Sequence, residues 1–349
     1  MNTAPTKKDI RKLKLEDLKS FFVDHGEKPF RANQVYEWLW KKSAKDFDQM
    51  TNISLSTREL LKEHFEINAV KVDNMQRSSD GTMKNAVCLH DGLIVESVLI
   101  PTPKRITACV SSQVGCSLDC KFCATARLKR MRNLSADEIY DQVVAIRQQA
   151  ELFFNRPLTN IVFMGMGEPL LNYTNVLAAI DKITSEQGLN MASRRITVST
   201  VGIAKMIRKL ADDEVKFNLA VSLHDAIDET RSSIMPINDT NPLVDLAEAL
   251  KYWYKKTKRK VTYEYVVWSG INDTEKHALA LVKFCRHIPS KVNLIEYNPI
   301  DDGVFQQASE RSIKMYQDIL EKNGIIARVR SSRGKDIDAA CGQLANKSI

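Results

Sequence analysis

The chain has 349 residues, 44% of them hydrophobic and 27% charged, which is the composition of a globular protein with room for one large domain and a smaller one. It contains no apolar run of the ~18 residues that a membrane span needs and no apolar signal-peptide segment near its start, so we expect a cytoplasmic location. The formal net charge of +8 favours a polyanionic partner such as a nucleic acid, because lysine and arginine bind phosphates regardless of base sequence.

Residues 1–68 are predicted to form a small helical accessory domain. Apolar residues recur at helical spacing in 14–24 and 31–42, and a third helix is expected over 57–65, after a start rich in Ser and Thr. The segment 27–32 between two of these helices is either a turn that touches RNA or a plain packing element, and the pattern leaves both interpretations open.

Residues 69–101 are predicted to form a linker of short antiparallel strands. The hydrophobic period changes there from helical spacing to alternation, and the turn sequences SDG at 79–81 and HDG at 90–92 separate the strands. The linker leads into the main domain, residues 102–349.

Strand and helix patterns alternate in the main domain, which predicts an α/β fold. Buried strands are expected over 106–111, 159–164, 195–200, 215–223, 261–267 and 292–297. Amphipathic helices occupy the stretches between them, so the six βα units would form a partial (β/α)6 barrel of parallel strands. A last strand, 326–331, precedes a C-terminal loop. Barrels of this kind place their sites at the carboxyl ends of the strands.

Three cysteines follow the first strand of this domain with the spacing C-x-x-x-C-x-x-C: Cys116, Cys120 and Cys123. Three thiolates leave one coordination position open, whereas a structural zinc ion takes four protein ligands. The all-thiolate set favours an iron–sulfur cluster with one iron free to bind a small molecule. The alternative is a zinc knuckle with Cys109 as its fourth ligand.

Polar residues also follow several of the later strands. The second strand leads into GMGEP over 165–169, where glycines permit close approach of the backbone and Glu168 can accept hydrogen bonds from an ammonium group. A simple turn explains this sequence equally well. Ser199, the segment 222–224 and Asn298 end later strands, where they could bind a ribose or a carboxylate, or be structural only.

Three longer runs make the chain resemble one family. They are CVSSQVGC over 109–116, MGMGEPL over 164–170 and DIDAACGQL over 336–344, and with the cysteine spacing they resemble the RlmN family of radical S-adenosylmethionine (SAM) enzymes over essentially the whole chain. The resemblance implies a radical SAM barrel and methylation of adenine C2, in the peptidyl-transferase region of 23S rRNA and beside the anticodon of some tRNAs. It also implies one 4Fe–4S cluster, two SAM molecules per turnover, an electron donor such as flavodoxin or ferredoxin, and a monomer.

The resemblance assigns roles to individual residues. The cluster ligands would be Cys116, Cys120 and Cys123, the SAM contacts Gly167, Glu168, Ser199, Ser222, Leu223, His224 and Asn298, the methyl carrier Cys341, its resolving partner Cys109 and the base Glu96. Family members often have glycine where this chain has Ala126, which a basic run over 127–132 follows. That departure would alter the rim of the RNA site and leave the cluster ligands intact.

The implied chemistry needs two separate cysteines, because adenine C2 is not nucleophilic and cannot take a methyl group from SAM directly. The Cys341 thiolate would first accept a methyl group from one SAM. A radical from the second SAM would remove a hydrogen atom from that methyl group, and the carbon radical would add to C2. Loss of the C2 proton to Glu96 and attack of Cys109 on the Cys341 sulfur would release the product. Arg333 is the candidate for orienting the base.

Two other functions stay open at this point. A zinc-stabilised, non-catalytic RNA-binding protein would account for the basic charge and the three close cysteines, but it leaves Cys341 without a role. The Cfr type of methyltransferase resembles the RlmN family in its cluster and lone cysteines but methylates C8 of the same rRNA adenine. An Arg-Gly pair at 333–334 favours the C2 type, since the two types differ in how the adenine is presented to the methyl carrier.

Overall fold

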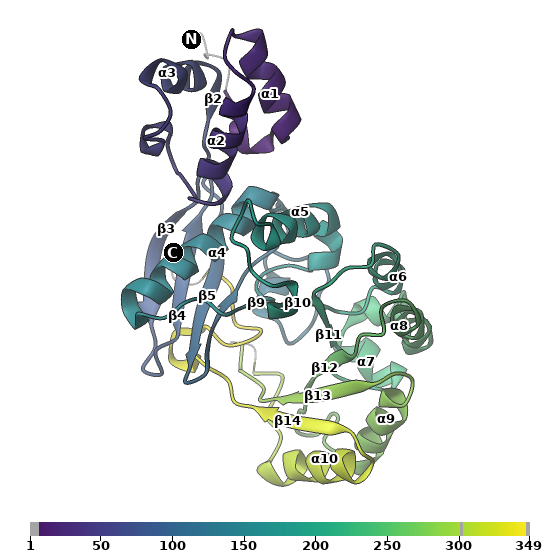
Figure 1. Cartoon of the computed structure of the whole chain (residues 1–349). Coiled ribbons are helices and arrows are strands. Elements are labelled where there is room, and N and C mark those ends of the chain that lie inside the picture. Colours follow the sequence, from purple (N-terminus) through teal and green to yellow (C-terminus); the bar gives the residue numbers. More distant parts are fainter. Residues whose placement is uncertain (1–6, 301–302, 347–349) are drawn as a thin grey trace.

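A small helical domain lies at one end of a larger α/β domain in the computed structural model, which describes residues 7–300 and 303–346 (Figure 1). The small domain contains α1 (Leu15–Asp24), α2 (Phe30–Trp40), α3 (Leu55–His64) and two short paired strands, β1 (Lys8–Asp9) and β2 (Phe65–Glu66). Ser54 caps α3, because its hydroxyl accepts a hydrogen bond from the Thr57 N–H at 3.2 Å. All three helices agree with the hydrophobic spacing.

A ten-stranded sheet organises the larger domain. In spatial order its strands are β14 (Ile326–Arg330), β13 (Ser290–Ile295), β12 (Val261–Val266), β11 (Asn218–Ser222), β10 (Ile196–Thr200), β9 (Asn160–Phe163), β6 (Arg105–Cys109), β5 (Ile94–Thr102), β4 (Met83–Cys88) and β3 (Lys71–Arg77). The strands from β6 to β14 pair in parallel, so the predicted parallel core is confirmed.

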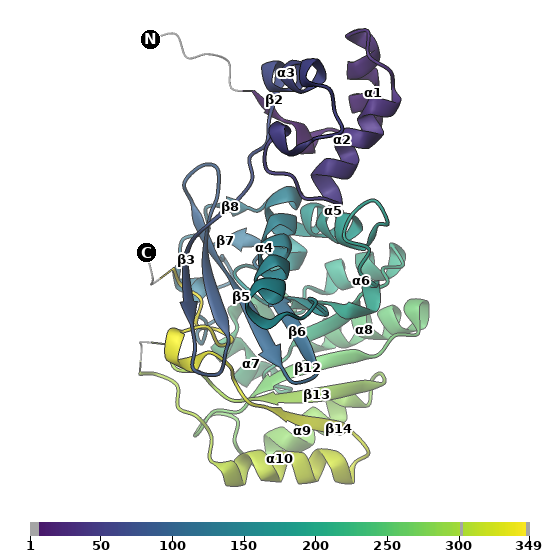
Figure 2. The same ribbon diagram turned by 60° about the vertical axis from the view of Figure 1, so that its left-hand side comes forward.

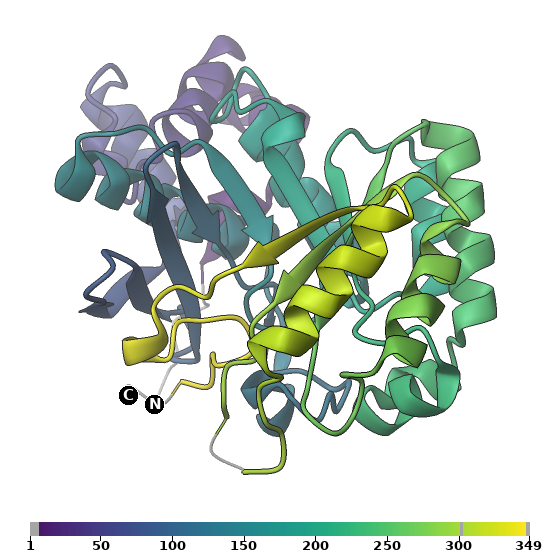
Figure 3. The same ribbon diagram turned by 90° about the horizontal axis from the view of Figure 1, so that it is seen from below.

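Helices follow the parallel strands and lie along the outer face of the curved sheet (Figure 3). They are α4 (Ala136–Phe154), α5 (Tyr173–Thr184), α6 (Ala204–Asp212), α7 (Asp228–Ile234), α8 (Leu243–Thr257), α9 (Glu275–Cys285) and α10 (Glu310–Lys322). Both α7 and α8 follow β11, so the chain forms the six expected βα units before β14. None of these helices is long and apolar enough to cross a membrane within the described ranges.

The side chains along β12 alternate between the outer and the inner face of the sheet. Tyr263 and Tyr265 are fully buried, and their rings pack against Phe284 of α9 and Tyr316 of α10, each pair with centroids 5.5 Å apart. Because successive side chains of a strand point to opposite faces, Glu264 points into the barrel. The outer face is therefore apolar core, and polar side chains gather inside the barrel.

The strands predicted for the linker are not a separate sheet. The strands β3, β4 and β5 pair antiparallel with one another, and β5 pairs with β6, so they extend the barrel sheet on its open side. The proposed division into 1–68, 69–101 and 102–349 stays a prediction.

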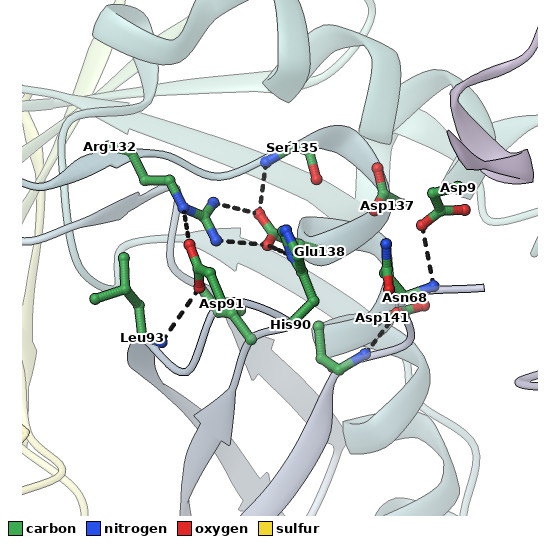
Figure 4. Close-up of polar contacts among 12 residues, drawn as sticks. Asp9, Asn68, His90, Asp91, Leu93, Arg132, Ser135, Asp137, Glu138 and Asp141 are labelled. Carbon is green, nitrogen blue, oxygen red and sulfur yellow. Dashed lines mark hydrogen bonds and ion pairs between the residues drawn. The ribbon is translucent and has the colours of Figure 1, made fainter. Parts of the chain in front are cut away.

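Ion pairs join the small domain to α4. The Arg11 side chain is buried and lies 2.8 Å from Asp141, 3.4 Å from Asp137 and 3.1 Å from Asp9. Asp9 also accepts a hydrogen bond from the backbone N–H of Asn68 at 3.1 Å, where the chain leaves the small domain (Figure 4). One buried guanidinium therefore links three carboxylates across the boundary.

The chain after β14 crosses the barrel as a strap, which we define as residues 331–346. The strap runs from β14 to the strands β3, β4 and β5 (Figures 2 and 3). Near its start, Asp336 accepts hydrogen bonds from the Ser78 hydroxyl at 2.6 Å and the Ser79 N–H at 3.0 Å. The strap is thus attached to the turn between β3 and β4, more than 250 residues earlier in the chain.

Candidate active site

The loop 115–131 carries the three clustered cysteines and is closed by the short strands β7 (Gln113–Val114) and β8 (Arg132–Asn133). Arg132 donates to both oxygens of Glu138 at 2.8 Å and to Asp91 at 2.6 Å (Figure 4). This side chain was counted in the basic run expected at the RNA rim. It instead anchors the cysteine loop to α4 and to the β4–β5 turn.

An apolar cluster surrounds the cysteines. Its buried members are Cys120, Ile234, Met235, Val266, Trp268, Ile295, Tyr297 and Phe305. Phe122 and Cys123 pack against it, and the Phe122 ring lies with its centroid 4.7 Å from that of His224 and 5.1 Å from that of Trp268. The site has a low local dielectric as a result.

The three clustered thiols act on one another electrostatically. Burial raises the pKa of Cys116, Cys120 and Cys123, and the charge of Cys123 raises the pKa of the other two further. Thiolates are the metal ligands, so ligation here must release protons. Within the described ranges, no three His, Cys, Asp or Glu side chains converge on a single metal ion, whereas the three thiolates of a 4Fe–4S cluster each bind a different iron. Neighbouring thiols in apolar surroundings fit an iron–sulfur cluster.

Glu168 is buried at the end of β9 with its carboxylate held by backbone donors. Its Oε1 accepts from the Leu170 N–H and its Oε2 from the Val201 N–H, both at 3.0 Å. Its own N–H donates to the Gln113 side chain at 2.9 Å. Burial raises the pKa of Glu168 to about 7. A carboxylate has about four acceptor positions, so this group can still receive a ligand's ammonium.

The glycines beside Glu168 serve close packing within the chain. Gly167 has φ +89°, and a Cβ there would lie 2.4 Å from the Gln113 Cβ. A Cβ on Gly165 would lie 2.7 Å from the Ser111 hydroxyl. The segment 111–113, which leads into the cysteine loop, thus occupies the space that the missing side chains leave. Close backbone approach was expected here, and the partner is the protein itself.

The predicted SAM contacts on β10 and β11 lie at adjacent strand ends. The hydroxyl oxygens of Ser199 and Ser222 are 3.4 Å apart, and the Leu223 side chain is fully buried. His224 adopts φ +60°, and its Nδ1 accepts from the Val266 N–H at 3.2 Å. Burial lowers the pKa of His224 to about 3, so its ring is neutral.

Arg231 ties these two strand ends together. Its side chain is fully buried and donates to the carbonyl of Leu223 at 3.0 Å, to that of Val201 at 2.5 Å and to the Asn238 amide oxygen at 2.6 Å. Burial lowers the pKa of Arg231 to about 10, and the nearby Cys120 opposes that change. The guanidinium therefore holds the backbone at the ends of β10 and β11 in place, and with it the predicted SAM contacts on those two strands.

Asn298 connects the loop after β13 to the strap. Its side-chain N–H donates to the Cys341 carbonyl at 3.2 Å. Its Oδ1 is buried and has no hydrogen-bond partner in the part of the chain that the structure describes. A buried amide oxygen without a partner is costly, so this atom is suited to receive a donor from a ligand.

The strap brings Cys341 close to two other cysteines. Cys341 is exposed, while Cys109 is buried at the end of β6. Burial raises the pKa of Cys109 to about 12, and the charge of Cys341 contributes to that rise and to the raised pKa of Cys123. Arg330 lowers the pKa of Cys109, and it lies 3.8 Å from Glu264 inside the barrel. Cys109 and Cys341 are therefore close enough for the charge of one thiolate to act on the other.

Glu96 and Arg333 are the other two predicted site residues; Glu96 contacts the strap, and Arg333 belongs to it. The Glu96 carboxylate lies 3.3 Å from the Lys84 ammonium and accepts backbone hydrogen bonds from the strap. Arg333 is partly exposed and lies 3.9 Å from Asp80 in the β3–β4 turn. The role of Glu96 as base and that of Arg333 in orienting the adenine stay predictions.

Known proteins match this chain over its whole length. Residues 8–67 match the ribosomal RNA large subunit methyltransferase N-terminal domain, and residues 110–282 match the radical SAM superfamily. The probable dual-specificity RNA methyltransferase RlmN of Flavobacterium psychrophilum is 70% identical over 98% of this chain and 99% of its own length. That of Streptococcus agalactiae is 41% identical over 100% and 96%. The chain belongs to the RlmN family.

A solved structure agrees with this assignment. The crystal structure of a radical SAM methyltransferase from Sphaerobacter thermophilus is 39% identical, with a TM-score of 0.91 over 97% of this chain and 99% of the other. The RlmN-family chain is therefore a radical SAM enzyme that methylates RNA, and membership of the superfamily brings SAM and a 4Fe–4S cluster as cofactors. The non-catalytic RNA-binding alternative is excluded.

Several residues that shape this RlmN-family site had no signal in the sequence. Lys84, Arg231 and Arg330 are polar side chains within predicted strands, helices or loops, and none belongs to a motif with a chemical meaning. Gln113 lies inside the run that carries the resemblance, which was its only signal. Their contacts depend on segments that meet only in the folded chain.

Proposed function

We propose that this RlmN-family enzyme methylates adenine C2 in the peptidyl-transferase region of 23S rRNA and beside the anticodon of some tRNAs, using two SAM molecules per turnover. The position of the Cys341 segment carries the proposal: the N–H of Ala124, next to Cys123, donates to the Gly342 carbonyl at 2.8 Å, and the charge of Cys341 acts on both Cys123 and Cys109. A methyl carrier must meet SAM at the cluster cysteines and a resolving thiol afterwards. The RlmN name of the relatives supports C2 over the C8 of the Cfr type.

The cofactors would be held by residues at the carboxyl ends of neighbouring strands. Cys116, Cys120 and Cys123 would hold the cluster, which supplies the electron for reductive cleavage of SAM when it is bound. The buried Glu168 carboxylate would accept the SAM ammonium, and the orphan Asn298 oxygen would accept a further donor. Gly167, Ser199 and the 222–224 segment would complete the contacts.

Cys341 would act as the methyl carrier. Its thiolate attacks the SAM methyl carbon, so that a carbon–sulfur bond forms as the bond to the SAM sulfonium breaks, and S-adenosylhomocysteine leaves. The charge of Cys341 raises the pKa of the Arg330 guanidinium, so a cation stays beside the carrier. The Asn298 hydrogen bond to the Cys341 carbonyl orients the carrier.

Cys109 would release the product after the methyl-derived carbon has joined C2, Glu96 has accepted the C2 proton, and the radical adduct has given up one electron, for which the oxidised cluster would be the acceptor. The Cys109 sulfur attacks the Cys341 sulfur, and a disulfide forms as the Cys341 carbon–sulfur bond breaks. The bonding electrons stay with carbon, which takes up a proton and becomes the methyl group. The disulfide must then be reduced by a thiol reductant, while a flavodoxin or ferredoxin would supply the cluster's electrons.

The small helical domain would contact the RNA. In the 27–32 segment Phe30 is 48% exposed, and the Arg31 guanidinium lies 5.1 Å from its ring centroid. An exposed aromatic beside an arginine suits stacking on an unpaired base. We further propose that the enzyme acts as a monomer in the cytoplasm, where its RNA substrates are.

The regiochemistry can be tested with in vitro modification of 23S rRNA and tRNA whose adenines carry deuterium at C2 or at C8. We expect nuclease digests to contain 2-methyladenosine, with deuterium lost from C2 and kept at C8. Loss of deuterium from C8 with retention at C2 would contradict the proposal and assign the chain to the Cfr type.

A further inference from the structure

A buried ion pair lies beneath the strap on the added antiparallel strands. The β4–β5 register pairs Ala86 with Glu96 and Lys84 with Val98, so Lys84 and Glu96 are diagonal neighbours on one face of the sheet. Their charged groups are 3.3 Å apart, and their side chains are 3% and 1% exposed. Burying two charges costs several kcal/mol each unless further hydrogen bonds satisfy them.

Those further hydrogen bonds come from the strap, on both sides of Cys341. The Lys84 ammonium donates to the carbonyl of Asp338, three residues before Cys341, at 3.5 Å. The Glu96 Oε2 accepts the backbone N–H groups of Ala345 at 2.8 Å and Asn346 at 3.1 Å, after Cys341. The pair therefore holds the strap at two points with the exposed thiol between them.

Two further hydrogen bonds also help to position Cys341, and they are separate from the Lys84–Glu96 ion pair. The Ala124 N–H donates to the Gly342 carbonyl at 2.8 Å and the Thr125 hydroxyl to the Leu344 carbonyl at 2.7 Å, so the strap also touches the cysteine loop. Those contacts fix the distance of the strap from the cluster ligands. The ion pair fixes where the strap lies on the face of β4 and β5.

We propose that Lys84 and Glu96 form a clasp that positions Cys341, with Lys84 as a positioning residue that no family motif identifies. The proposal rests on the proposed role of Cys341 as methyl carrier. It adds a consequence for Glu96: one carboxylate oxygen faces Lys84, and the other holds two strap N–H groups. The two N–H groups occupy both acceptor positions of Oε2, so this oxygen can accept a proton only after the strap end at 345–346 has moved away.

The clasp can be tested by hydrogen exchange of the strap amides in the full chain, which needs no turnover. In Lys84→Met we expect the Ala345 and Asn346 amides to exchange at least about tenfold faster, because their hydrogen bonds to the charged Glu96 carboxylate are lost or weakened. Lys84→Arg should keep most of the protection. Lys71→Met, an exposed lysine on the neighbouring strand β3, is the matched control and should not change it.

A double variant separates positioning from simple stability. Lys84→Met alone leaves Glu96 buried without its cation and should lower the melting temperature, whereas Lys84→Met with Glu96→Leu replaces both charges by apolar groups and should recover it. The strap amides should stay fast in the double variant, since the acceptor is gone. Retained protection in the double variant, or exchange in Lys84→Met within about twofold of wild type, would overturn the proposal.

The rate at which Cys341 becomes methylated distinguishes the clasp proposal from the methyl-carrier role on which it rests. If the clasp positions the carrier, Lys84→Met should form S-methylcysteine from SAM more slowly, and Lys84→Arg should restore the rate. Normal loading in Lys84→Met together with a loosened strap would overturn the positioning role. A wild-type enzyme that never methylates Cys341 would instead refute the carrier role, and the exchange result would stand by itself.

Discussion

The Asn298 side-chain N–H lies 3.2 Å from the Cys341 carbonyl, while the amide oxygen of the same side chain is buried without a partner in the described ranges. The Asn298 side chain thus binds the strap through its N–H group, and its oxygen remains available to a ligand. This arrangement joins a predicted SAM contact to the predicted methyl carrier, and it makes both halves of the amide testable.

Replacing Asn298 should weaken SAM binding and displace the strap together. In Asn298→Ala we expect the Kd for SAM to rise roughly tenfold, because a buried ligand donor would lose its acceptor. Isothermal titration of the cluster-loaded protein measures this. Asn293→Ala is the control, since Asn293 donates to Glu264 at 2.9 Å deeper in the barrel. Equal Kd values for Asn298→Ala and wild type would remove the SAM role.

Replacing the two lone cysteines should stop the reaction at different points. Cys109→Ala should accumulate protein crosslinked to RNA, because the adduct forms but no thiol attacks the Cys341 sulfur. Cys341→Ala should form neither S-methylcysteine nor adduct. Denaturing gels and peptide mass spectrometry detect both species, and Cys285→Ala, which alters a buried thiol in α9, is the control. Normal turnover of Cys109→Ala would show that the roles are wrong.

Gly167 should be far less tolerant of a methyl group than another glycine of positive φ. Gly167→Ala places a Cβ 2.4 Å from Gln113, so we expect a loss of about 1–3 kcal/mol from overpacking beyond the ~1–2 kcal/mol of left-handed strain. Gly270→Ala, at φ +72° with no atom within 4 Å, should show the strain alone. Thermal unfolding of both variants measures the difference, and equal melting temperatures would contradict it.

Acid should detach the start of the strap. The hydrogen bond from Ser78 lowers the pKa of Asp336, and that from Lys335 lowers the pKa of Glu296, so both are stronger acids folded than unfolded. Their contribution to stability is therefore complete above the unfolded pKa, near 4, and is lost as pH falls below it. Hydrogen exchange of residues 334–338 should accelerate there beyond its intrinsic pH dependence. Asp336→Asn should reduce that acceleration, and an unchanged profile would contradict the prediction.

Arg11 should be essential for docking of the small domain. Arg11→Met would leave Asp9, Asp137 and Asp141 close together without their shared cation, which costs about 3–5 kcal/mol for a broken buried ion pair. Urea unfolding should show this loss or a separate early transition of the helical domain. Lys251→Met, which removes an exposed pair with Glu248, should change little. A similar midpoint for both variants would refute the docking role.

The local order of residues was enough to predict the elements of this protein and to suggest a set of cluster ligands. Helical spacing located α1, α2 and α3, because the burial of one face imposes a period on the chain, and runs of apolar, β-branched residues located the seven parallel strands. The spacing of Cys116, Cys120 and Cys123 indicated thiolate ligation of a cluster, since ligands close in sequence can converge without help from the rest of the fold.

Only the tertiary structure decided what the polar side chains do. Glu96 lies about 250 residues from the strap amides that it holds, and Lys84 gains a role only because β4 pairs with β5 beneath the strap. Arg132 was expected to face RNA, but its guanidinium donates hydrogen bonds to Glu138 and Asp91. A charge in the sequence does not specify its partner, because hydrogen bonds and ion pairs form between any segments that the packing of the apolar core brings together.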